Sequence, residues 1–133
     1  RQGSIRAPQW KGGGVVFAPT PRDYSFKLNK KEKRAALKSV LTSRVQDNKL
    51  IVLDELKLDT IKTKDFKKVM HNLKIGKAMV VIDGQDENVI LSARNLPTVN
   101  TAVAENINVY DILKGDTLVL TKDAVAKIEE VFA

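Results

Sequence analysis

The stretch LIVLDELKLDTIKTKDFKKVMHNLKIGKAMVVI, residues 50–82, decides the fold class of this chain. It begins with a short continuous apolar run, residues 50–53, and ends with a second one, residues 78–82. Such runs are typical of strands that are buried on both faces. Between them, Thr63 is a candidate N-cap for an amphipathic helix that Gly76 would end. A strand, a helix and a second strand in succession predict a parallel pair joined by a right-handed crossover.

The same alternation continues toward the C-terminus. A short helix near residues 87–94 is followed by a weaker strand at residues 99–103, and Asn108 can cap a brief helix after it. Residues 118–120 are the last expected strand, and Thr121 can cap a closing helix. We therefore expect an α/β domain with a doubly wound, mostly parallel sheet flanked by helices, without an internal repeat or a second domain.

A helix is also expected before residue 50. Asn29 is a candidate N-cap, and Glu32 stands three residues later, where it completes a capping-box pair. The helix is expected to run to about Val45. Its apolar residues fall on one stripe that we expect to be buried: Ala36, Leu37, Val40, Leu41 and Val45.

Four cations, Lys30, Lys31, Lys33 and Arg34, crowd the first turn of that helix. The helix macrodipole disfavours a cation there by about 0.3–1 kcal/mol at low salt. Lys30 and Arg34 also share the azimuth of the apolar stripe, so they do not simply form the solvated back of the helix. This placement predicts that the first turn projects beyond the core toward an anionic partner. A solvated run of charges is the alternative.

The opening of the chain has a different composition. Residues 1–38 hold ten Lys and Arg against two acids, together with three of the four prolines and four of the seven glycines. A segment with so few periodic apolar residues does not bury enough surface to offset its ordering entropy. We therefore expect residues 1–28 to be an extended basic arm that orders on a polyanion, and residues 29–133 to be the globular domain.

Two features of the arm have more than one interpretation. Gly12, Gly13 and Gly14 do not form a phosphate-binding loop, because no strand precedes them and no Lys-Ser/Thr pair follows. We expect them to allow a close backbone approach, with amides free to meet phosphate oxygens. Trp10 is expected either to stack on an unpaired base or groove of RNA, or to fold back onto the domain.

Little in the sequence indicates catalysis. The chain has no cysteine, which excludes disulfides and thiolate chemistry, and no apolar run approaches the roughly 20 residues that span a bilayer. The one histidine, His71, has no partner at metal-ligand spacing and is expected at the surface or at its boundary. No nucleophile, base and oxyanion hole can be assembled. We expect no enzyme activity, no catalytic residue, no metal site and no cofactor.

One competing class of function is a receiver-like or nucleotide-binding α/β signalling domain. Asp54 and Asp83 each follow an expected strand, at the edge of the sheet where α/β proteins bind ligands. Lys122 is a candidate for the lysine that a receiver domain needs after its last strand. However, the paired acids such a domain needs after its first strand are missing, and aspartates also cap helices and begin turns.

Several stretches together resemble the family of bacterial large-subunit ribosomal protein four, in one collinear register over essentially the whole chain. They are RQGSIRAPQWKGGGVVFAPTPR, KLNKKEKRAALKSVL, KTKDF, LSARNLP, NVYDIL and LTKDAVAKIEEVFA. Two differences stand out. The N-terminal part of the family is not represented, so we expect the chain to be the C-terminal part of something longer, with a sheet short of that first strand. Ala18 also stands where the family pattern has glycine.

The resemblance implies a structural component of the large ribosomal subunit, cytoplasmic and ribosome-bound, with roles in subunit assembly. Its arm would thread through ribosomal RNA toward the peptide exit tunnel, with residues 1–22 as the returning strand of a long loop. Implied partners are large-subunit ribosomal RNA, neighbouring ribosomal proteins and, in some members, the messenger leader; no membrane is involved. A free RNA-binding regulator outside the ribosome is a further alternative. The expected RNA-binding residues are Arg1, Arg6, Trp10, Lys11, Gly12, Gly13, Gly14, Arg22, Lys27, Lys30, Lys31, Lys33, Arg34 and Lys38.

Overall fold

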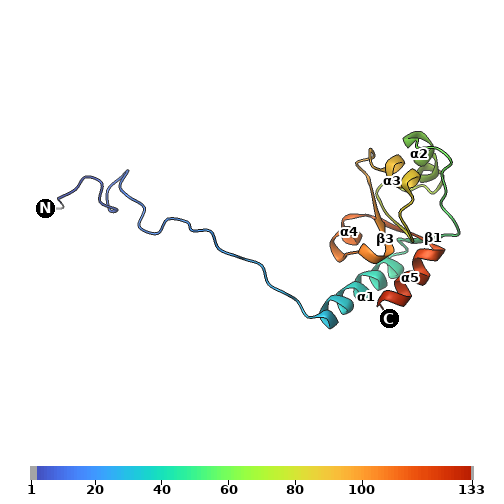
Figure 1. The fold of residues 1–133 in the computed structure, drawn as a ribbon, viewed down its shortest axis with the longest axis horizontal. Helices are drawn as coiled ribbons and strands as arrows, with labels where there is room; N and C mark the ends of the chain where they lie inside the picture. Colours follow the sequence, from blue (N-terminus) through green and yellow to red (C-terminus); the bar gives the residue numbers. More distant parts are fainter. Residues whose placement is uncertain (1–2, 133) are drawn as a thin grey trace.

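Helices and strands alternate along the computed structural model, which describes residues 3–132 (Figure 1). This alternation confirms the expected α/β class. The elements are α1 (Lys30–Gln46), β1 (Leu50–Leu53), α2 (Thr63–Asn72), β2 (Ala78–Ile82), α3 (Glu87–Ala93), β3 (Val99–Val103), the 3-10 helix η1 (Ala104–Asn106), α4 (Val109–Lys114), β4 (Thr117–Thr121) and α5 (Lys122–Phe132).

The four strands form one all-parallel sheet in the order β1-β4-β2-β3. β2 and β4 lie in the middle, where Val80 is in register with Val119 on one side and Thr101 on the other. Every residue of β2 is buried. Since parallel strands in α/β folds are covered on both faces, the continuous apolar run of β2 is explained by its central position.

Helices cover both faces of the sheet and divide the core into two clusters. One face packs against α1, α4 and α5, and its buried residues include Leu37, Met79, Leu118, Ile112 and Ile128. The opposite face packs against α2 and α3 around Phe66, Met70, Val80, Val89 and Val119. The sheet is therefore doubly wound, as the sequence predicted.

The expectation that residues 50–53 are buried on both faces is wrong. β1 is an edge strand that pairs only with β4, and its residues are partly buried or exposed. Val52 is 52% exposed. An apolar run shows that a segment favours a strand, but it does not distinguish a central position from an edge.

Both expected ends of α2 are also wrong. Lys62 is the N-cap, and Thr63 is already the first helical residue. At the other end, Lys74 takes the left-handed conformation, with a φ of 56°. Its backbone N–H donates to the His71 carbonyl at 3.0 Å, and the Ile75 N–H donates to the Met70 carbonyl at 3.1 Å. This is a Schellman motif built on lysine rather than on Gly76.

α1 begins as expected, but its buried stripe differs. The Glu32 carboxylate accepts a hydrogen bond from the Asn29 backbone N–H at 3.2 Å, which is half of a capping box. Leu37 is buried, Val40 and Leu41 pack against the core, and the stripe then continues to Arg44. Val45, which we expected to be buried, is 58% exposed, and Ala36 is also exposed. Arg44 lies seven residues after Leu37, which places it on the same face of the helix.

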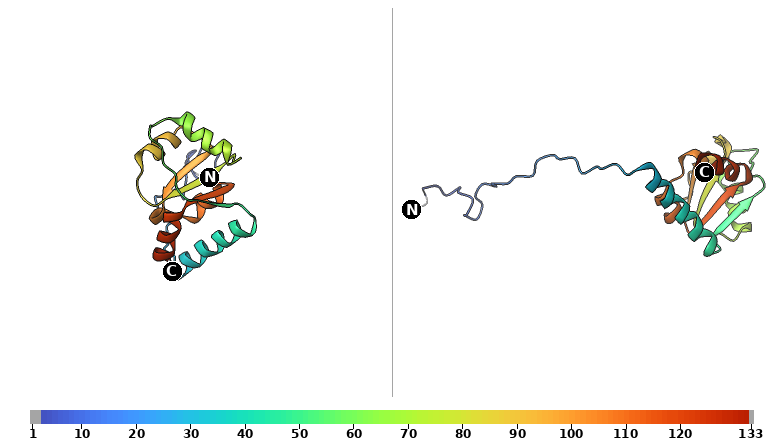
Figure 2. Two further views of the ribbon diagram at one scale, coloured as in Figure 1. Left: turned by 90° about the vertical axis from the view of Figure 1, so that its right-hand side faces the viewer. Right: turned by 90° about the horizontal axis from the view of Figure 1, so that it is seen from below.

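Residues 3–29 contain no helix or strand and are almost entirely exposed. Figures 1 and 2 show this segment leaving the N-terminal end of α1 and extending away from the sheet and its helices. The C-terminal end of α5 lies close to the point of departure (Figure 1). One end of the domain therefore carries both the base of the segment and the end of the described chain.

Candidate nucleic-acid interface

The cations that the sequence singled out are all exposed where the structure describes them. They are Arg6, Lys11, Arg22, Lys27, Lys30, Lys31, Lys33, Arg34 and Lys38. Arg1 lies outside the described residues. Within residues 3–132 the ion pairs involve other lysines, Lys57, Lys68 and Lys127, so none of these nine cations is neutralised by a carboxylate of its own chain. Nine unpaired cations on one segment and the helix start that follows it form a surface suited to a polyanion.

The glycine-rich part of the arm is folded on itself. Trp10 N–H donates to the Ala7 carbonyl at 3.0 Å, Gly13 N–H to the Trp10 carbonyl at 2.9 Å and Gly14 N–H to the Arg6 carbonyl at 2.9 Å. A Cβ on Gly13 would lie 2.0 Å from the Ala7 carbonyl oxygen. The close backbone approach predicted for the glycines therefore occurs within the arm.

The accompanying prediction of free amides is wrong for two of the three glycines. The N–H groups of Gly13 and Gly14 donate within the loop. Gly12 has a φ of 80°, a conformation that glycine adopts without strain. These glycines shape the loop and do not offer a row of amides to phosphate.

Trp10 does not pack against the domain. Its side chain is 51% exposed, and the views in Figures 1 and 2 place its segment far from the sheet. Of the two interpretations of Trp10, the structure disfavours folding back onto the domain. Base stacking stays a prediction.

Sequence reasoning missed the other aromatic residues of the arm. Phe17 is 93% exposed, Phe26 82% and Tyr24 75%, and the Arg22 guanidinium lies 4.1 Å from the centroid of the Tyr24 ring. Exposed rings among unpaired cations are the combination that stacks on single-stranded bases while the cations bind phosphate. The signal in the sequence was the recurrence of aromatic residues in a basic segment without helical or strand periodicity.

The first turn of α1 lies outside the core, as predicted. Lys30, Lys31, Lys33 and Arg34 are all exposed, and burial of the helix begins only at Leu37. Glu32 is the only acid in this turn, and its carboxylate accepts from the Asn29 backbone. The positive end of the helix dipole and four exposed cations therefore lie together at this end of α1.

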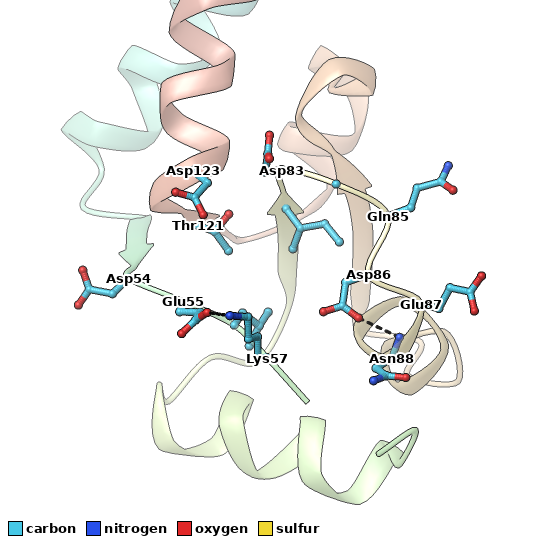
Figure 3. A pocket seen from close by; sticks show the side chains of 13 residues that line it. Asp54, Glu55, Lys57, Asp83, Gln85, Asp86, Glu87, Asn88, Thr121 and Asp123 are labelled. Carbon is cyan, nitrogen blue, oxygen red and sulfur yellow. Dashed lines mark hydrogen bonds and ion pairs between the residues drawn. The ribbon is translucent and has the colours of Figure 1, made fainter. Parts of the chain in front are cut away.

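The competing site is a cleft of about 590 Å³ at the carboxyl ends of the strands. Figure 3 shows Asp54, Asp83, Asp86 and Asp123 around it, with the carboxylates of Asp54 and Asp83 pointing in different directions. Lys122 is exposed and does not line the cleft. A receiver-type site needs its acids and lysine to converge, and here they do not.

Several of the cleft's acids have structural partners instead. Asp86 caps α3, its Oδ1 accepting from the Asn88 N–H at 3.0 Å. Asp83 and Glu105 both pair with Lys127, at 3.4 and 3.1 Å, and these hydrogen bonds, that of Glu105 first, raise the pKa of the Lys127 ammonium. Glu55 pairs with Lys57. These contacts favour a structural role for the acids over the signalling alternative.

Two further features bear on other classes of site. Among the described residues, no group of three or more His, Asp or Glu side chains could hold a metal ion. His71 is exposed, as expected. Of the helices described, none has the length and apolar character to cross a bilayer.

Comparisons with known proteins match nearly the whole sequence. The sequence model of the ribosomal protein L4/L1 family matches residues 1–131. The large ribosomal subunit protein uL4 of Lachnoclostridium phytofermentans is 71% identical over 133 residues, and that of Agathobacter rectalis is 68% identical. The protein of the same name from Clostridium botulinum is 53% identical. Each match covers all of this chain and 65% of the relative's length.

Proposed function

Because this chain belongs to the ribosomal protein L4/L1 family, we propose that it is a structural component of the large ribosomal subunit that binds ribosomal RNA through its basic arm. Residues 1–28 form the RNA-binding arm, and residues 29–133 form the domain that anchors it. The relatives are named for the ribosomal subunit and not for a reaction. The function is therefore architecture and assembly.

The observation that carries this proposal is the set of unpaired cations. Among the described residues, Arg6, Lys11, Arg22 and Lys27 form no ion pair, and the cations of the first turn of α1 continue the set. Each cation that meets a phosphate releases condensed counterions, so the affinity depends steeply on salt. With six to ten contacts, the loss is about 10³–10⁵ between 50 and 200 mM salt.

Specificity requires more than charge. A-form RNA hides the base edges of its major groove, so proteins read its shape and its unpaired bases. Trp10, Phe17, Tyr24 and Phe26 are exposed on the arm and present ring faces to such bases. The folded loop around Gly13 adds a fixed shape to an otherwise extended segment.

The remaining parts of the proposal rest on family resemblance. The arm runs toward the peptide exit tunnel, and the domain stays near the surface of the subunit, where neighbouring ribosomal proteins contact it. The chain acts in the cytoplasm, bound to the ribosome. A role in assembly needs binding and shape but no turnover.

Filter binding to large-subunit ribosomal RNA fragments tests the proposal. In one variant of the full chain, Arg6, Lys11, Arg22 and Lys27 become Gln. The negative slope of log affinity against log salt should become shallower by roughly 3, because each lost phosphate contact reduces its magnitude by about 0.7–0.9. Circular dichroism should remain that of the parent chain, since these residues make no contact with the core.

The matched control removes four lysines from the domain instead. Lys62, Lys64, Lys67 and Lys74 lie exposed in or beside α2, so their replacement by Gln changes the net charge equally. The proposal predicts a nearly unchanged slope for this control. An equal reduction of the salt slope in both variants would show that RNA binding follows net charge. An unchanged slope in the arm variant would refute the proposal.

A further inference from the structure

Arg44 is the one buried cation among the described residues, and it joins α1 to the end of α4. Its side chain is 8% exposed. Nη2 donates to the carbonyls of Ile112 at 2.8 Å, Leu113 at 3.1 Å and Gly115 at 2.8 Å, and Nη1 approaches the Asp116 carbonyl at 3.4 Å. The last carbonyls of a helix have no partner within the helix. Arg44 supplies those partners from another helix, about 70 residues away in the sequence.

The end of α4 that Arg44 binds is fixed to the centre of the sheet. A Cβ on Gly115 would lie 3.1 Å from the Met79 nitrogen and 3.2 Å from its Cβ, so the backbone here presses against β2. Ile112 is 1% exposed within the same core cluster. The carbonyls that accept from Arg44 therefore belong to a rigid part of the domain.

α1 has few other attachments. Leu37 and Arg44 are its only buried residues among 17, and its most extensive contact is with α4. Beside its N-terminal half runs an apolar groove of about 480 Å³, lined by residues that include Leu28, Val109 and Phe132. The narrow stripe of contact and the open groove leave the tilt of α1 weakly determined by apolar packing alone.

We infer that Arg44 is a positioning residue that fixes the direction in which α1 carries the basic arm away from the domain. α1 spans about 25 Å at 1.5 Å per residue, with Arg44 near one end and the arm at the other. A tilt of about 10° at Arg44 therefore moves Lys31, 13 residues away, by roughly 3–4 Å.

This inference rests on the proposed function for its biological consequence. An arm that departs in a fixed direction meets its RNA site at a high effective concentration once the domain is in place. An arm on a loosely tilted helix samples many directions, and its effective concentration falls. The guanidinium suits the task because its planar fork presents several donors at once, whereas an ammonium is a point charge on a flexible stem.

Distances between spin labels in the free protein test the inference without RNA. The chain has no cysteine, so labels can be placed by substitution at exposed Lys31, at the tip of α1, and Lys67, on α2. In the parent background this pair should give a narrow distribution. In the Arg44→Met and Arg44→Lys variants, the distribution of distances should shift or broaden by about 3–4 Å or more. The change should be smaller in the lysine variant than in the methionine variant.

Two controls separate positioning from loss of structure. A second label pair, Lys31 and Asp47, spans α1 alone and should be unchanged if the helix remains intact. Val119→Ala removes volume from the opposite core cluster and should lower stability without altering the distribution between residues 31 and 67. If either folded Arg44 variant kept the parent distribution, or if Val119→Ala broadened it equally, the inference would be overturned. RNA binding plays no part in these outcomes, so they stand apart from the test of function.

Discussion

The arm and the domain use the same side chain in opposite ways. Phe17 is 93% exposed in the arm, and Phe66 is fully buried between α2 and the sheet. Both parts of the chain contain aromatic residues, valines and isoleucines, so composition does not separate them. What differs is periodicity: Phe66 recurs with Val69 and Met70 on one helical face, whereas the apolar residues of the arm share no face. The domain therefore has a core of its own, and the arm depends on a partner to bury its rings.

The largest expected effect comes from replacing each of these two phenylalanines by alanine in a separate variant. Phe66→Ala should lower the free energy of unfolding by about 3–5 kcal/mol, because it opens a cavity in the core. Phe17→Ala should change that free energy by no more than about 0.5 kcal/mol, because its side chain touches no core residue. Denaturant titration measures both. The order of the two variants should reverse when the RNA affinity of the folded protein is measured. Phe17→Ala should then weaken affinity by about 1–3 kcal/mol, because its ring would no longer stack on a base. A large loss of stability in Phe17→Ala would contradict the division between arm and domain.

A smaller effect is expected at the junction, where the two regions meet. Replacing Lys30, Lys31 and Lys33 by Gln should raise the stability of the domain at low salt, by roughly 0.3–1 kcal/mol for each cation removed from the first turn of α1. The same variant should bind ribosomal RNA more weakly. Thermal unfolding at 10 and 500 mM salt measures the first effect, which screening should abolish at high salt. A variant that lost stability would show that these lysines belong to the domain rather than to its RNA-binding surface.

The smallest effect concerns a surface pair that lies wholly within the domain. The hydrogen bond from Lys68 to Asp65, 2.9 Å long, lowers the pKa of the Asp65 carboxyl. A pKa lower in the folded than in the unfolded state gives stability above the unfolded value near 4, and that stability is lost as the pH falls through the folded value. Asp65→Asn should therefore be slightly less stable than the parent at pH 7 and equally stable near pH 2. Since the pair is exposed, the difference should be small. No effect on RNA binding is expected at either pH.

The sequence predicted which segments form helices and strands better than it predicted where each element lies in the fold. Continuous apolar runs located β1 and β2, and the caps Asn108 and Thr121 are confirmed by hydrogen bonds to Asp111 N–H at 2.8 Å and Ala124 N–H at 3.3 Å. The same runs did not show that β1 lies at an edge, because the neighbours of a strand are set by the whole topology. The end of α2 was missed because Lys74 adopts a conformation that sequence statistics assign to glycine.

The candidate interface was predictable in charge and less so in detail. Cations concentrated on a segment without periodicity indicated a polyanion, and the nine predicted cations that the structure describes are exposed and form no ion pair. Sequence alone did not show that Gly13 and Gly14 turn their amides inward, because those bonds depend on the loop closing on Arg6 and Trp10. Arg44 was missed because a charge at a core position is readable only once its four carbonyl acceptors come together.

Hydrogen exchange of the full chain, free and bound to a large-subunit ribosomal RNA fragment, tests most directly whether RNA supplies the fold that the arm lacks. In the free chain, amides between residues 15 and 28 should exchange at nearly unprotected rates while those of β2 and β4 are strongly protected. RNA should slow exchange across the arm by at least tenfold and leave the domain almost unchanged. Strong protection of the arm without RNA, or an arm that exchanges equally fast in the complex, would contradict the account.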